Sequence, residues 1–291
     1  METNSTVRTD LALEAHEMCR DEAREVSEIE GVSSCVERYG NVTLTRVNIL
    51  DENGSKRLGK AVGRYVTIEA ANLKYDEDEY NAVCRLICDE IRAMADIDAG
   101  DVTLVAGLGN SKITPDALGS KVVDSLMITH HIKRYMAQLL DENISNVCAI
   151  KPGVLGTTGI ETVEIIKGIT DTLKPKLVIA VDALAAADIN RVSTTIQIAD
   201  TGIAPGSGVG NNREGINAET LGTKVIAIGV PTVIDAATIS KVEIPKELAP
   251  LMVTTKDIDS VIERMSKTVA NGINLALHKD ITLDEIENFV M

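Results

Sequence analysis

Two apolar runs that each lead to an Asp-Ala-Leu unit constrain the fold of this chain more than any other feature. Residues 102–106 lead through a glycine turn to Asp116, and residues 177–181 lead directly to Asp182. Neither run alternates polar with apolar residues, which is typical of parallel strands covered on both faces. Ligands of open α/β sheets bind beyond the carboxyl ends of such strands. The sequence therefore predicts that Asp116 and Asp182 face one crevice.

The rest of the chain alternates expected strands with expected helices. Apolar residues recur at helical spacing from Asp76 onward, after Thr114 and from Ile258, and Thr158 to Glu161 has the pattern of a capping box. Further strands are expected at 42–47, 65–68, 147–150, 194–199 and 225–230. This order predicts an α/β fold, with a mostly parallel sheet and helices on both faces.

The first thirty residues are polar and rich in charge, so we expect an exposed arm or a solvated helix outside the core. The N-terminus lacks the apolar stretch of a signal peptide, and the five cysteines are scattered and odd in number. We therefore expect a soluble protein of a reducing, cytoplasmic-type compartment, without a membrane span.

Charge and aromatic content argue against direct binding to nucleic acid. The net charge is −15, and the chain has five tyrosines, one phenylalanine and no tryptophan. Binding to nucleic acid requires a basic surface and, for single strands, aromatic stacking platforms. A basic protein or peptide would be a more suitable partner electrostatically.

A close pair of carboxyl groups has a specific chemical use. Two such groups share one proton, and their apparent pKa values move apart. The ionised member can activate water while the protonated member polarises a carbonyl or protonates a leaving nitrogen. Asp116 alone could instead simply complement the N-terminus of a helix. The matching position of Asp182 favours the catalytic interpretation.

Two further aspartates follow expected strands. Asp200 begins an Asp-Thr-Gly sequence, the tripeptide of pepsin-like proteases, but those folds are all-β and require two copies, so a strand-to-loop turn is the favoured interpretation. Asp200 can still line the crevice. Asp235 follows the strand expected at 225–230 and can support the site from behind.

Other motifs are less specific. Residues 54–61 nearly match a phosphate-binding loop but lack its final Ser or Thr, and we expect a hairpin turn there. Cys84 and Cys88 share a helix face without a second pair of ligands, so buried cysteines are favoured over zinc. We expect no metal and no cofactor.

Several motifs in order resemble one protein family. They are Arg8 to Ala15, Gly107 to Asn110, Thr114 to Gly119, Asp182 to Ala186, and Gln197 to Asn211. Together they span almost the whole chain and resemble the spore germination protease of endospore-forming bacteria.

The resemblance implies an atypical aspartic endopeptidase with essential residues at Asp116 and Asp182. It implies a fold similar to hydrogenase maturation proteases, a homotetramer, a zymogen made during sporulation, and small acid-soluble spore proteins as substrates. Its compartment would be the cytoplasm of the forespore and the spore core. Residues 1–10 would be a propeptide, and residues 11–291 a single peptidase domain with insertions near 40–75 and 200–220.

The N-terminal region contains a sequence similar to the substrate site of that family. The site resembles Thr/Ser-Glu followed by Ile/Phe-Ala-Ser/Thr-Glu, cut after the first Glu, and residues 9–14 read Thr-Asp-Leu-Ala-Leu-Glu. The chain is therefore expected to cut itself between Asp10 and Leu11. Two alternatives remain, a metal-dependent peptidase of the hydrogenase-maturation type and a peptide-binding scaffold without catalysis.

Overall fold

A single large sheet organises the part of the chain that the computed structural model describes, namely residues 9–23, 29–98, 100–136, 138, 143–206, 213–240 and 251–290. The nine strands follow the order β1-β2-β3-β7-β8-β6-β4-β5, and β9 pairs with β8. Their bounds are β1 (Val32–Tyr39), β2 (Val42–Ile49), β3 (Gly63–Glu69), β4 (Val102–Gly107), β5 (Asn146–Ile150), β6 (Leu177–Ala186), β7 (Thr195–Ala199), β8 (Lys224–Asp235) and β9 (Met252–Val253).

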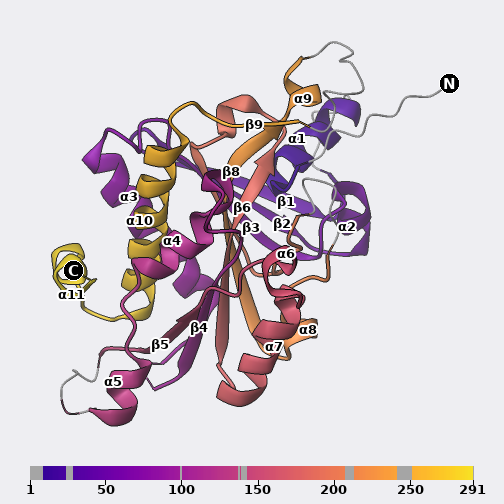
Figure 1. Cartoon of the computed structure of the whole chain (residues 1–291). Helices are drawn as coiled ribbons and strands as arrows, with labels where there is room; N and C mark the ends of the chain where they lie inside the picture. The colour runs from indigo at the N-terminus through magenta and orange to yellow at the C-terminus, as the bar shows by residue number, and fades with distance from the viewer. Residues whose placement is uncertain are drawn as a thin grey trace.

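Helices lie on both sides of these strands (Figure 1), with α3, α4 and α10 on the left and α7 and α8 on the right. The α-helices are α1 (Ala12–Ala23), α2 (Glu52–Leu58), α3 (Glu77–Met94), α4 (Leu118–Asp124), α5 (His130–Tyr135), α6 (Leu155–Thr158), α7 (Thr162–Leu173), α8 (Ala218–Leu221), α9 (Ala236–Ser240), α10 (Ile258–Leu277) and α11 (Leu283–Val290). Two short 3-10 helices are η1 (Thr114–Asp116) and η3 (Ile189–Arg191).

The strands β5, β4, β6 and β8 are parallel to one another. Both faces of β4 and β6 are buried, because alternate residues enter two separate cores. Val105 and Val181 pack with α3 and α10, whereas Leu104 and Val178 pack with α7. The predicted α/β fold with a covered parallel core is confirmed.

The other half of the sheet is antiparallel, from β8 through β7, β3 and β2 to β1. Only two residues join β1 to β2, and such a short connection permits an antiparallel pair but not a parallel crossover. The 42–47 and 65–68 runs form β2 and β3 as expected. Parallel pairing therefore covers the half of the sheet that carries the two Asp-Ala-Leu units.

The expectation of an exposed arm or solvated helix is wrong for residues 11–14, whereas Glu17, Arg20 and Asp21 farther along α1 are exposed. Leu11, Ala12 and Leu13 are buried, and Leu11 is 0% exposed. Leu11 packs with Leu184 and other residues near the end of β6, while Ala12 joins the core beneath β2 and β3. These distant partners bury the start of α1 despite the polar sequence that follows it.

Two local predictions are also wrong. Residues 52–58 form helix α2 instead of a hairpin turn, because the Asp51 carboxylate caps the helix by accepting from the N–H groups of Asn53 and Gly54. Helix α7 begins after Glu161, and the expected capping residue Thr158 instead ends α6. Cys84 and Cys88 are buried in the core, as predicted.

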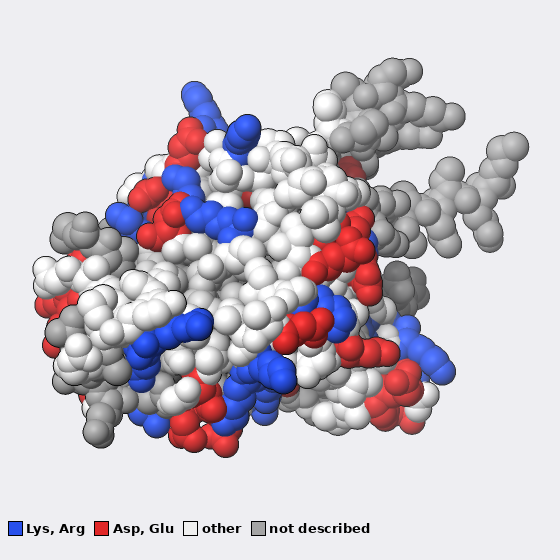
Figure 2. Space-filling model, turned by 60° about the horizontal axis from the view of Figure 1, so that its bottom comes forward, with Lys and Arg blue, Asp and Glu red and all other residues white. Residues whose placement is uncertain are grey.

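The visible face in Figure 2 carries acidic and basic side chains intermingled around uncharged areas, with no continuous basic field. None of the helices in the described ranges combines the length and the apolar character that crossing a membrane requires.

Candidate active site

Asp116 lies at the end of η1, where the chain leaves β4 and turns toward α4. Its Oδ2 atom accepts a hydrogen bond of 2.7 Å from the N–H of Asn110. Gly109 permits this tight turn, because its φ is +90° and a Cβ there would lie 2.1 Å from the Asp116 carbonyl oxygen. Burial raises the pKa of the Asp116 carboxyl, and the Asn110 hydrogen bond opposes that shift.

Asp182 lies within β6, one residue beyond the last pair that β6 makes with β4. Its side chain is buried, and Oδ1 accepts from the N–H of Ala183 at 2.9 Å. Burial raises the pKa of Asp182 well above its ordinary value, and the negative charge of Asp116 raises it further. The two predicted carboxyl groups are thus close enough for the charge of Asp116 to act on Asp182.

Close backbone packing holds the two aspartates together. The N–H of Leu108 donates to the carbonyl oxygen of Val181 at 2.8 Å, which ties the end of β4 to the residue before Asp182. Gly119, in the first turn of α4, packs on this junction. A Cβ at Gly119 would lie 2.4 Å from the Leu108 nitrogen and 2.5 Å from the Val181 oxygen. Only glycine therefore lets α4 approach closely enough to place Asp116 beside β6.

The segment Thr9–Leu11 lies along the end of β6. The N–H of Asp10 donates to the carbonyl oxygen of Ala185 at 3.1 Å, and the N–H of Ala185 donates to Oδ2 of Asp10 at 2.9 Å. The charge of Asp10 also contributes to the raised pKa of Asp182. The predicted cleavage residue is therefore held on β6, the strand that carries Asp182.

Glu14 fixes the other end of the N-terminal segment. Its carboxylate accepts hydrogen bonds from the backbone N–H of Ala187 at 2.7 Å and of Asp188 at 2.9 Å, and Arg191 lies 3.9 Å away. The hydroxyl of Thr9 also donates to it. Burial raises the pKa of Glu14, and these hydrogen bonds oppose the shift.

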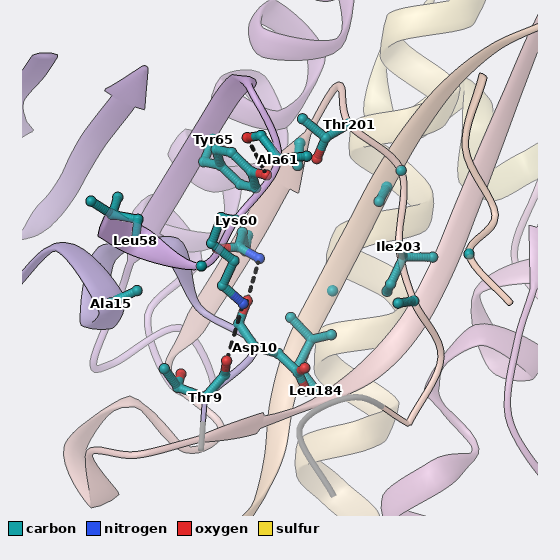
Figure 3. A pocket seen from close by; sticks show the side chains of 18 of the residues that line it. Thr9, Asp10, Ala15, Leu58, Lys60, Ala61, Tyr65, Leu184, Thr201 and Ile203 are labelled. Atoms are coloured by element: carbon teal, nitrogen blue, oxygen red, sulfur yellow. Dashed lines mark hydrogen bonds between the residues drawn. The ribbon is translucent and has the colours of Figure 1, made fainter. Parts of the chain in front are cut away.

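An open cavity of about 610 Å³ adjoins the segment, between α1, α2 and the strands β3, β7 and β8. Figure 3 shows Lys60 reaching from its wall toward Thr9 and Asp10. The Nζ atom donates to the carbonyl oxygens of Thr9 at 3.0 Å and Asp10 at 3.1 Å. No sequence motif points to a catalytic role for Lys60, although it lies in the segment that resembles a phosphate-binding loop.

Gln197 in β7 holds the segment from the floor of the cavity. Its Nε2 donates to the carbonyl oxygen of Asp10 at 3.2 Å, and its Oε1 accepts from the N–H of Ala12 at 2.7 Å. Gln197 and Asp182 both pair with Gly229 of β8, so their side chains share one face of the sheet. Gln197 begins one of the motifs that carry the family resemblance, but the sequence predicts a site role only for Asp200 in that motif.

The two further aspartates do not join the pair through any described contact. Asp200 forms a strand-to-loop turn, as favoured, and its Oδ1 accepts from the N–H of Arg64 at 2.8 Å. Asp235 is the last residue of β8 and accepts from the N–H of Ala237 at 2.7 Å. Across the described ranges, no group of three or more His, Cys, Asp or Glu side chains converges in a way that could hold a metal ion.

The chain is similar to known proteins over nearly its whole length. The family model described as germination protease matches residues 12–248 and 244–290. The germination protease of Clostridium tetani is 41% identical, over 98% of this chain and 99% of the relative. That of Caldanaerobacter subterraneus subsp. tengcongensis is 43% identical over 98% of both chains, and that of Bacillus mycoides is 37% identical over 96% of this chain and 95% of the relative. The chain therefore belongs to the germination protease family of peptidases.

Proposed function

We propose that this chain is an atypical aspartic endopeptidase of spore germination, in which Asp116 and Asp182 share one proton and hydrolyse a peptide bond. The observation that carries this proposal is the coupling of the two carboxyl groups. Asp182 has its pKa raised by burial and by the charge of Asp116, so both groups do not ionise together easily. One can then act as base and the other as acid.

We further propose that the chain is made as a zymogen and that residues 9–14 act as its internal substrate. Each expected recognition feature has a partner in the structure. The Asp10 carboxylate, before the bond, accepts a hydrogen bond from the N–H of Ala185. The apolar side chain of Leu11, after the bond, packs with Leu184 and Val192. The second acid, Glu14, accepts hydrogen bonds from two backbone N–H groups. This match supports cleavage between Asp10 and Leu11.

The same pattern supports small acid-soluble spore proteins as the substrates, with hydrolysis in the spore core. The backbone N–H groups that donate hydrogen bonds to Asp10 and Glu14 would donate in the same way to the two glutamates of a Thr-Glu-Ile-Ala-Ser-Glu site.

The proposal includes a homotetramer. The edge strand β1 leaves Val36 and Tyr39 exposed, which suits contact with another copy, and sedimentation of the purified chain tests this.

The proposed chemistry is tested by hydrolysis of a Thr-Glu-Ile-Ala-Ser-Glu peptide, with and without a strong chelator. The dyad predicts cleavage after the first Glu at a rate that the chelator leaves unchanged. Loss of hydrolysis on chelation, with recovery when a metal is returned, would favour a metal-dependent peptidase. Binding of the peptide without cleavage at any pH would favour a scaffold.

A further inference from the structure

The carbonyl oxygen of Asp10 accepts hydrogen bonds from two side chains that belong to different parts of the fold. Lys60 donates from the loop after α2 at 3.1 Å, and Gln197 donates from β7 at 3.2 Å. The bond that follows this carbonyl is the one that the proposed function has the chain cut. Both donors therefore lie on the oxygen that gains negative charge when water adds to the carbonyl carbon.

Gln197 also fixes the residues on both sides of that bond. Its Oε1 accepts from the N–H of Ala12, while Nε2 donates to Asp10, so one amide group spans Leu11. The N–H of Leu11, which belongs to the bond itself, donates to the Thr9 hydroxyl at 3.0 Å. The orientation of the peptide plane is therefore set by contacts at its oxygen and at its nitrogen.

The position of Gln197 relative to Asp182 follows from the register of three strands. Both residues pair with Gly229, and neighbouring strands lie about 4.8 Å apart, so their backbones are roughly 10 Å apart across β8. Gly229 carries no side chain between them and lines the cavity. The Leu184 side chain covers Gly229, because a Cβ there would lie 2.4 Å from Leu184 Cδ1, and the same leucine packs with Leu11 of the bound segment.

Lys60 is suited to a developing negative charge. Lys60 is half-buried in the wall of the open cavity, and this burial lowers its pKa, while the charges of Asp10 and Glu14 oppose that shift. A cation within hydrogen-bond distance stabilises a developing anion, and partial burial strengthens that attraction relative to a fully exposed pair.

We infer that Lys60 and Gln197 form an oxyanion site for the carbonyl before the scissile bond. This inference rests on the proposed function. Water bonds to the Asp10 carbonyl carbon, one water proton passes to the ionised carboxyl of the dyad, and the C=O electron pair moves onto the oxygen held by Lys60 and Gln197. The C–N bond then breaks as the pair returns to the carbonyl. The Leu11 nitrogen keeps the bonding pair and takes a proton from the dyad, which leaves an acid and an amine.

The test compares full-length variants by the first-order rate of Asp10–Leu11 cleavage and by hydrogen exchange at the amides of Ala12 and Ala185. Lys60→Met should slow cleavage by about 100-fold or more, the typical effect of removing one oxyanion donor. Gln197→Glu should act similarly, because it keeps the acceptor for Ala12 but loses the donor to Asp10. Lys60→Arg should retain most of the rate, and Lys56→Met, an exposed change on α2, should retain all of it.

Hydrogen exchange distinguishes an effect of Lys60 on catalysis from an effect on the docking of the N-terminal segment. The inference expects Lys60→Met to leave the protection of Ala12 and Ala185 intact while cleavage slows. Cleavage by Lys60→Met within threefold of the parent rate would overturn the inference. Slow cleavage with loss of protection at the Ala12 and Ala185 amides would also overturn it, because Lys60 would then only hold the segment. Asp116→Asn is measured in parallel, because continued cleavage there would contradict the proposed dyad and leave the Lys60 result standing. If the parent chain cuts neither its own segment nor an added peptide, both the proposed dyad and the proposed oxyanion site are overturned.

Discussion

Asp182 and Gln197 lie on one face of the sheet, on either side of Gly229, although they belong to strands that run in opposite directions. The parallel pairing of β6 with β8 places Asp182 beside Gly229, and the antiparallel pairing of β7 with β8 places Gln197 on the other side of the same glycine. The bound N-terminal segment contacts both strands, because Asp10 exchanges hydrogen bonds with Ala185 of β6 and its carbonyl oxygen accepts a hydrogen bond from Gln197 of β7. The candidate site thus lies at the junction of the two halves of the sheet.

The first prediction concerns the carboxyl pair. Asp116→Asn and Asp182→Asn should each lower peptide hydrolysis by about 1,000-fold or more, because an amide can neither share the proton nor activate water. Both variants should remain folded by circular dichroism. Asp200→Asn is the matched control, since its remaining oxygen can still accept from Arg64, and near-normal turnover is expected. Turnover by a folded Asp116→Asn chain would remove Asp116 from the mechanism.

The second prediction concerns the pH dependence of stability. The pKa of Asp182 is raised in the folded chain above its ordinary value of 3.8, so the folded state binds this proton more tightly than the unfolded state does. The stability that Asp182 contributes is therefore present at low pH and is lost as pH rises through the raised pKa. The difference in Tm, Asp182→Asn minus parent, should grow between about pH 4 and pH 8. A difference that stays flat or shrinks would contradict the raised pKa.

Much of this site follows from sequence because the signals are local. The runs that form β4 and β6 are mostly apolar without alternation, which indicates covered parallel strands, and the carboxyl ends of such strands share one edge of a sheet. The placing of Asp116 and Asp182 near that edge is therefore predictable from sequence alone. Gln197 cannot be found in this way. Its role depends on the register of β7 against β8 and of β8 against β6, and no local pattern specifies those two registers.

The burial of the N-terminal segment escapes sequence reasoning for a related reason. The polar sequence around it predicts exposure, whereas Leu11 is buried by Leu184, Ala186 and Val192, which lie more than 170 positions away in the chain. The resemblance to a substrate nevertheless points to residues 9–14 as a segment of interest. Helix α2 is not predicted because Asp51 to Gly54 has the chemistry of a turn, and that same chemistry also caps a helix.

The third prediction uses the packing of α4 on the sheet. Gly119→Ala should destabilise the fold by about 3 kcal/mol, the upper part of the usual range for overpacking, because its Cβ would meet the backbone of Leu108 and Val181. Activity should fall with it as Asp116 moves. Gly168→Ala is the control within helix α7, where the space is open, and it should stabilise by about 0.5–1 kcal/mol. Urea denaturation measures both, and equal effects at the two sites would contradict the packing argument.

The fourth prediction concerns the docking of the N-terminal segment. Glu14→Gln replaces one acceptor oxygen with an NH₂ group that faces a backbone N–H donor. The chain then loses a hydrogen bond to a charged group, which contributes about 1.5–3 kcal/mol to stability. The amides of Ala187 and Asp188 should exchange faster, and Asp10–Leu11 cleavage should slow. Asp21→Asn, on the exposed side of α1, should change neither. Unchanged exchange in the Glu14→Gln chain would show that this carboxylate does not hold the segment.

The central claim is that the chain cuts itself at Asp10–Leu11 with the Asp116 and Asp182 pair. Mild acid should promote this step, since it increases the population of the singly protonated pair. The decisive measurement is N-terminal sequencing after incubation of the full-length chain at about pH 5–6, a range in which a desolvated carboxyl with a raised pKa can titrate. We expect a new terminus of Leu-Ala-Leu-Glu in the parent chain and none in Asp182→Asn. A terminus elsewhere, or the same terminus in folded Asp182→Asn, would contradict the account.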